Sequence, residues 1–148
     1  MSTGYQFTSR SALDTAVDLW ISNEAFAIKT YGDINTWDVS EITNFDNLFN
    51  DKSSFNSDIS NWDVSSGNTF YSMFEGTSFN QDISDWDLSK GTRFGRMFFG
   101  VTSFNQDISN WDVSNSWDFG SMFEDASSFN QDIGDWDVSS GVEFTGML

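Results

Sequence analysis

The chain repeats itself with a period of about 25 residues. Four segments share the pattern Phe-Asn-Ser/Gln-Asp-Ile-Ser/Gly-Asn/Asp-Trp-Asp-Val/Leu, and they begin at Phe55, Phe79, Phe104 and Phe129. Their tryptophans follow Trp37, in a degenerate first copy, at steps of 25, 24, 25 and 25 residues. A repeat of this length cannot bury its apolar edge alone, so successive copies stack on one another. The sequence therefore predicts one repeat domain whose functional part is a long regular surface rather than a catalytic pocket.

Aromatic residues recur in columns when the copies are aligned. Residues that recur with the period are expected to point inward and to stack on their counterparts. The columns are Trp37, Trp62, Trp86, Trp111 and Trp136; Phe45, Phe70, Phe94, Phe119 and Phe144; Phe49, Phe74, Phe98 and Phe123, with Leu148 in the last copy; and Phe55, Phe79, Phe104 and Phe129.

Shorter periods predict the shape of each copy. Trp86 and Leu88 alternate as on a strand, whereas Phe94, Met97 and Phe98 lie at the i, i+3, i+4 spacing of one helical face. We therefore expect a leucine-rich-repeat-like solenoid: an N-terminal helical cap and about five coils of about 25 residues. A short parallel β-sheet would lie on one face, with one strand per coil and strands ~4.8 Å apart.

The two ends of the chain differ. Ser11 and Asp14 have the form of a capping box, and a second helical turn is expected up to Tyr31-Gly32. The predicted organisation is a helical cap over residues 1–32 and one continuous solenoid over 33–148. No cap pattern follows the fifth coil. Either the C-terminus folds over its own end, or Met147 and Leu148 expose apolar surface for a protein partner or for self-association.

Composition excludes several classes of function. The formal charge of −17 repels phosphate backbones, so nucleic acid is not expected as a partner. The chain has no Cys and no His, which removes disulfides, imidazole metal ligands and the commonest general base. No secretory signal and no apolar run of membrane-spanning length is seen, so membrane insertion is not expected and the location stays open.

The motif Phe-Asn-Gln-Asp-Ile-Ser-x-Trp-Asp-Val-Ser, followed by Phe-x-x-Met-Phe, resembles the BspA-like leucine-rich-repeat surface proteins over about residues 31 to 148. Phe70, Phe94, Phe119 and Phe144 stand where that family commonly has Met. The resemblance implies a non-enzymatic protein that is displayed on a cell surface and acts in adhesion and in binding proteins or matrix. Members often carry signal peptides and anchors, and neither is seen here.

An Asp stands between Trp and Val or Leu in every copy, and strand alternation points it away from the core. One interpretation is that each Asp accepts hydrogen bonds in a local turn with the Ser two residues on. The other is an acidic strip that binds a basic partner or, on a weak signal, Ca²⁺. No other metal and no cofactor is expected. The column consists of Asp38, Asp63, Asp87, Asp112 and Asp137, of which Asp87 and Asp112 are the central binding candidates.

Three rings stand outside the columns, at positions that are mostly small or polar in the other copies. Trp117, Phe99 and Tyr71 are therefore expected to be exposed, either as partner contacts or as ordinary surface rings. Three of the six basic residues, Lys90, Arg93 and Arg96, also fall within seven residues. Arg93 is expected to pair with an acid of the next coil, or else to help dock an acidic partner.

No catalytic residue is predicted, because every carboxylate pair belongs to a repeated column and catalytic constellations are singular. Two functions remain. The first is a surface-displayed module for recognition, attachment or scaffolding that binds a protein or a glycan through an acidic solenoid face. The second is a structural component of a virus particle, a capsid decoration or tail-fibre protein docked through the end of the solenoid. A flat face that binds ice or mineral is a third and weaker idea.

Overall fold

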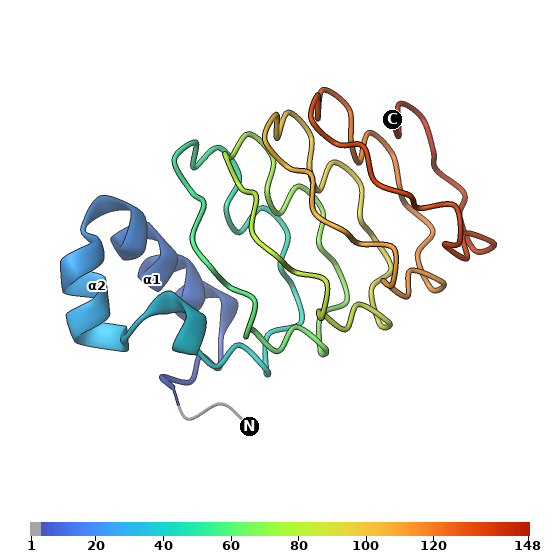
Figure 1. The fold of residues 1–148 in the computed structure, drawn as a ribbon. Coiled ribbons are helices and arrows are strands. Elements are labelled where there is room, and N and C mark those ends of the chain that lie inside the picture. Colours follow the sequence, from blue (N-terminus) through green and yellow to red (C-terminus); the bar gives the residue numbers. More distant parts are fainter. Residues whose placement is uncertain (1–3) are drawn as a thin grey trace.

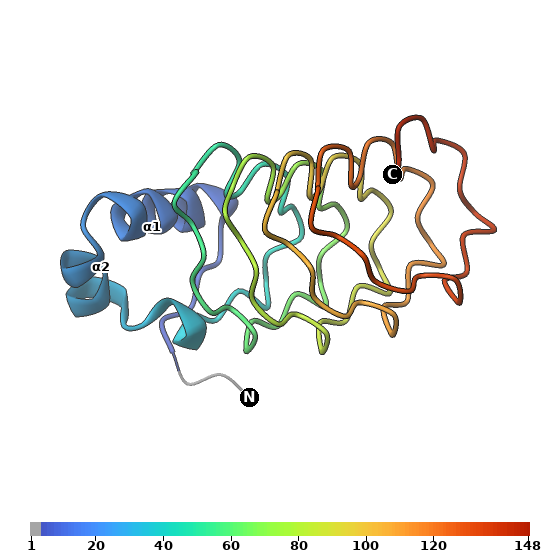
Figure 2. The same cartoon turned by 45° about the horizontal axis from the view of Figure 1, so that its top comes forward.

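The computed structural model describes residues 4–148. Two α-helices, α1 (Arg10–Ser22) and α2 (Glu24–Tyr31), are followed by the short 3₁₀ helix η1 (Ile34–Thr36). The rest of the chain winds into successive irregular coils that lie side by side, with the helices at one end and residue 148 at the other (Figures 1 and 2). We number the coils 1 to 5, as residues 33–54, 55–78, 79–103, 104–128 and 129–148.

The prediction of a leucine-rich-repeat-like solenoid with a parallel β-sheet is wrong. Residues 4–148 contain no β-strand and no sheet, and their only regular elements are the three helices named above. Neighbouring coils meet instead in isolated parallel bridges, one residue per coil, and these do not lie in the Trp-Asp-Val segment where strands were expected. The bridges join Asn44 to Thr69, Thr69 to Arg93, Arg93 to Asp118 and Asp118 to Glu143.

No strand forms beside the tryptophans because the backbone there turns back on its own coil. In coil 2 the carboxylate of Asp63 accepts the N–H of Ser65 at 3.0 Å, and the N–H of Gly67 donates to the carbonyl of Val64 at 2.8 Å. Within the described coils, no backbone hydrogen bond joins one Trp-Asp-Val or Trp-Asp-Leu segment to the next. The alternation of Trp and Val thus marks buried side chains without marking a strand.

The Phe-x-x-Met segment is not a helical turn either. Its third residue is left-handed in every coil, with φ between 52° and 65°, which breaks a right-handed helix. In coil 3 this residue is Arg96, whose N–H donates to the carbonyl of Gly120 in coil 4 at 2.8 Å. The N–H of the next residue, Met97, donates to the carbonyl of Phe94 in its own coil at 3.1 Å. Every second N–H of the segment therefore reaches the following coil.

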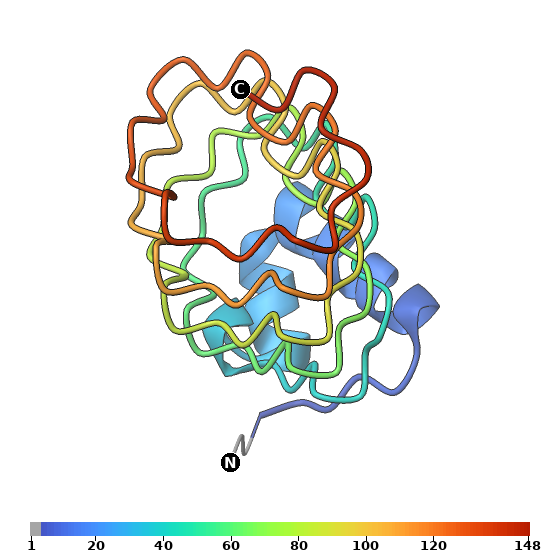
Figure 3. The same ribbon diagram turned by 90° about the vertical axis from the view of Figure 1, so that its right-hand side faces the viewer.

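The expected aromatic columns are confirmed as the core. Successive rings of the three Phe columns stack with centroids 5.3 to 6.3 Å apart. Most are fully buried, and Phe144 in coil 5, at 39% exposure, is the most open. Figure 3, which looks along the stack, shows the coils nested around this common interior. Each buried ring contributes roughly 1.5–3 kcal/mol through the hydrophobic effect.

The helices pack against the first coil, and α1 also reaches the second. The first N-cap is Ser9, whose hydroxyl accepts the N–H of Ala12, so the expected cap at Ser11 is wrong by two residues. The predicted end of the second helix is confirmed, since α2 ends at Tyr31 with Gly32 (φ 82°) as its C-cap. The indole N–H of Trp20 on α1 donates to the hydroxyl of Ser57 at 2.9 Å. This contact helps to hold α1 on the coils.

Candidate functional site

The acidic column lies in local turns, as the first of its two interpretations predicts. In each coil an Asp oxygen accepts the N–H of the Ser two residues later at 3.0 Å, and in coils 1 to 4 it also accepts that Ser hydroxyl at 2.6 Å. These bonds lower the pKa of Asp87, chiefly through the hydroxyl of Ser89. All the members are exposed except Asp38, which is half-buried.

The weak Ca²⁺ candidates are not brought together. Across residues 4–148, no group of three or more Asp, Glu, His or Cys side chains is placed to hold a metal ion. A polar hollow is lined by other carboxylates, among them Asp58, Asp82 and Asp85. The pKa of Asp82 is lowered by the hydroxyl and N–H of Ser84, so this carboxylate also takes part in a turn.

The off-column rings gather beside the bridges between coils. Tyr71 of coil 2, Arg93, Arg96 and Phe99 of coil 3 and Trp117 of coil 4 form what we call the aromatic–arginine patch. Trp117 is 44% exposed, as expected, whereas Tyr71 and Phe99 are half-buried. All except Phe99 line an open hollow of about 520 Å³ that extends to coil 5. The structure thus brings together three rings and two bases that the sequence marked separately.

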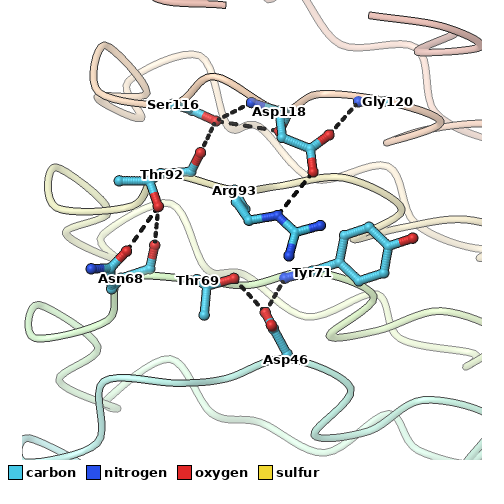
Figure 4. Close-up of polar contacts among 9 residues, drawn as sticks. All are labelled: Asp46, Asn68, Thr69, Tyr71, Thr92, Arg93, Ser116, Asp118 and Gly120. Carbon is cyan, nitrogen blue, oxygen red and sulfur yellow. Dashed lines mark hydrogen bonds and ion pairs between the residues drawn. The ribbon is translucent and has the colours of Figure 1, made fainter. Parts of the chain in front are cut away.

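Arg93 is the centre of this patch. Its guanidinium carbon lies 4.5 Å from the centroid of the Tyr71 ring and 5.4 Å from that of Trp117. Its Nε donates to a carboxylate oxygen of Asp118 at 3.1 Å, which confirms the expected pairing between coils (Figure 4). The Arg93 guanidinium is therefore held in place by one ring of coil 2 and by one ring and one carboxylate of coil 4.

The position of Asp118 depends on a glycine that sequence reasoning missed. A Cβ added to Gly95 would lie 2.8 and 2.9 Å from the two carboxylate oxygens of Asp118. Gly95 therefore makes room for this carboxylate, which is 7% exposed and also accepts the N–H of Gly120 at 3.1 Å. The corresponding residues of coils 1 and 2 are the larger Asp46 and Tyr71. The small residue of coil 3 at this position was the sequence feature that could have pointed to the role of Gly95.

Arg96 forms a second pair of the same kind. Its Nε and one terminal nitrogen donate to the two oxygens of Glu75 in coil 2 at 3.1 and 2.6 Å, and its guanidinium lies 3.9 Å from the centroid of the Phe99 ring. The bonds from Arg96 are the largest cause that lowers the pKa of Glu75, and the same contact raises the pKa of Arg96. Phe99 is thereby covered by an arginine rather than by the core.

Trp117 differs from the other tryptophans in its hydrogen bonding. The other six indole N–H groups each donate to a protein oxygen, and in coils 2 to 5 the column Trp donates to an Ile carbonyl of the preceding coil at 2.7 to 3.2 Å. Within the described residues the Trp117 indole N–H has no protein acceptor. Its ring therefore presents both an apolar face and an unused donor to solvent.

The remaining candidates lie apart from the patch. Asp87 and Asp112 remain in the acidic column, while Met147 is half-buried against the core and Leu148 is 80% exposed on coil 5. None of the helices in the described part of the protein is long and apolar enough to span a bilayer.

Coils stacked through aromatic columns, with one non-repeated patch of rings and arginines on their side, define a repeat protein. The chain belongs to the family described as Mycoplasma protein of unknown function, DUF285, whose model matches residues 20–116 and again 88–148. This family corresponds only loosely to the BspA-like repeat proteins. No curated protein and no solved structure matches the sequence.

Proposed function

We propose that the protein is a non-enzymatic recognition module that attaches to a protein partner through the aromatic–arginine patch. The observation that carries this proposal is Trp117, which is 44% exposed and has an unused indole donor beside a fixed arginine. Trp, Tyr and Arg are the residues most enriched among those that dominate binding energy in protein interfaces. The resemblance to BspA-like surface proteins supports attachment to another surface as the purpose.

The acidic column is the weaker candidate surface. Each of its Asp residues repeats the same turn in every coil, which gives it a structural role that needs no ligand. Its charge still favours basic partners at long range and keeps the protein soluble. The patch, in contrast, occurs once in the sequence and has no counterpart in the other coils.

The test is attachment of the purified protein to a panel of immobilised extracellular-matrix proteins, measured by surface plasmon resonance. At least one member should bind the parent protein, and Trp117→Ser should weaken that binding by about tenfold or more, as expected for a central interface residue. Asp87→Asn is the matched control, since it changes the acidic column and leaves the patch intact. Equal binding by the parent and Trp117→Ser, or no binding by any panel member, would contradict the proposal.

A further inference from the structure

The ligand chemistry of the patch follows from which of its groups are already used. A cation has little reason to bind, because the Arg93 guanidinium already lies beside the rings of Tyr71 and Trp117. The neighbouring carboxylates are engaged as well: Asp118 with Arg93 and Gly120, and Glu143 with the N–H of Thr145. The donors of Arg93 and Trp117 that have no protein acceptor are therefore the groups that a ligand meets beside the rings.

Those donors are the outer edge of Arg93 and the indole of Trp117. Only Nε of Arg93 has a protein partner among the described residues, which leaves both terminal nitrogens for a ligand. The Arg93 side chain is 36% exposed, so this edge is accessible. A guanidinium edge with two parallel N–H groups matches the two oxygens of a carboxylate. Because Asp118 and the two rings hold the guanidinium, little further ordering is needed on binding.

The apolar part of the ligand would lie next to this edge. The exposed ring of Trp117 and the side chain of Val142, which is 81% exposed, line the same hollow. We infer that the aromatic–arginine patch binds the free C-terminal carboxylate of a peptide, with the apolar side chain of its last residue packed on Trp117 and Val142. This inference rests on the proposed function and names the chemistry of its partner.

Two small probes that differ only in the carboxylate test this inference: N-acetylphenylalanine and its primary amide. Binding is followed by the NMR shifts of the Trp117 indole N–H and the Arg93 Nε–H, at about 0.15 M salt so that the −17 net charge is screened beyond roughly 8 Å. The carboxylate should shift both signals and bind at least about fivefold more tightly than the amide, because charged hydrogen bonds are the stronger ones. Arg93→Gln should abolish this preference, and Lys90→Gln, a base that does not line the hollow, should leave it unchanged.

Equal binding of the two probes, or a preference that survives in Arg93→Gln, overturns the inference. Stronger shifts with glucuronate than with N-acetylphenylalanine would replace the peptide with an acidic glycan and overturn it as well. These results are separable from the attachment test. If the probes bind equally while Trp117-dependent attachment persists, only the ligand chemistry is wrong. If the carboxylate preference holds while attachment ignores Trp117, the proposed function is wrong.

Discussion

The two sides of each coil hold neighbouring coils together in different ways. On the Trp side the link is a side chain, since the indole N–H of Trp86 donates to the carbonyl of Ile59 at 3.2 Å. On the Phe side the link is the backbone, where alternate N–H groups of one coil reach carbonyls of the next. A link through a side chain requires the same residue in every coil, whereas a link through the backbone leaves side chains free to vary. The patch lies on the side where they are free.

The largest expected effect is on the Trp side, from removing one column ring. Trp86 is 4% exposed and its ring lies 6.1 Å from that of Phe74. Trp86→Ala should lower the free energy of unfolding by about 3–5 kcal/mol, because it leaves a cavity in the core. Urea denaturation monitored by circular dichroism measures this loss. A variant that unfolds like the parent would show that the stacked columns do not hold the coils together.

A subtler change isolates the indole hydrogen bond. Trp86→Phe keeps an aromatic ring and removes the N–H, so the buried carbonyl of Ile59 loses its donor. The expected cost is about 1–3 kcal/mol, the penalty for an unsatisfied buried polar group. Trp117→Phe is the matched control, since its indole has no protein acceptor within the described residues. If the two variants lost the same stability, the indole bond would not be what links the coils on the Trp side.

On the Phe side one side-chain pair, Arg96 with Glu75, joins two coils in addition to the backbone bonds, and pH probes it. Arg96 lowers the pKa of Glu75 in the folded state, below the unfolded value of about 4.3. The pair therefore stabilises the fold above that unfolded value, and this stability is lost as pH falls through the folded pKa. Its size should be about 1 kcal/mol or less, since solvent screens an arginine that is 33% exposed.

Thermal unfolding from pH 7 to pH 3 tests this pair. Glu75→Gln should melt slightly below the parent near pH 7 and approach it at pH 3, where the parent has lost the ion pair. The melting temperature of Arg96→Gln should likewise lie slightly below that of the parent near pH 7 and approach it at pH 3, because both substitutions remove the same ion pair. An offset from the parent that stays constant across the whole range would mean that the pair contributes nothing that titrates.

The core of this fold and its helical N-terminal region could be predicted from the sequence, but the backbone conformation of the coils could not. Columns such as Phe70, Phe94 and Phe119 mark buried positions whatever the backbone does between them. The left-handed residue was not visible, because Ser72 and Arg96 hold that conformation without being glycine. The apolar residues around them have helical spacing. The left-handed conformation is stabilised by hydrogen bonds to the next coil, which the spacing does not report. A strand was wrongly expected beside Trp86 for a similar reason. The alternation of apolar and polar residues indicates which side chains are buried, and it does not indicate backbone pairing between coils.

The candidate site was predicted in parts. Trp117, Phe99 and Tyr71 stood out because they break columns, and the structure places them around two arginines of coil 3. Their assembly into one patch depends on how neighbouring coils are aligned in space. Aligning the repeats predicts that alignment for the columns, but not which residues outside the columns come into contact. The role of Gly95 depends on an atomic contact with Asp118, and no spacing in the sequence reports such a contact.

The smallest expected effect on stability separates the patch from the columns. Trp117→Ser removes a ring that is 44% exposed, whose centroid lies 5.4 Å from the Arg93 guanidinium. The ring fills no core position and its N–H bonds no protein atom among the described residues, so the free energy of unfolding should change by no more than about 0.5 kcal/mol. Trp111→Ser, at the column Trp of the same coil, is the control and should be severely destabilised. A large loss from Trp117→Ser would make Trp117 a structural residue, and the patch would then lose the feature that distinguishes it from the repeated columns.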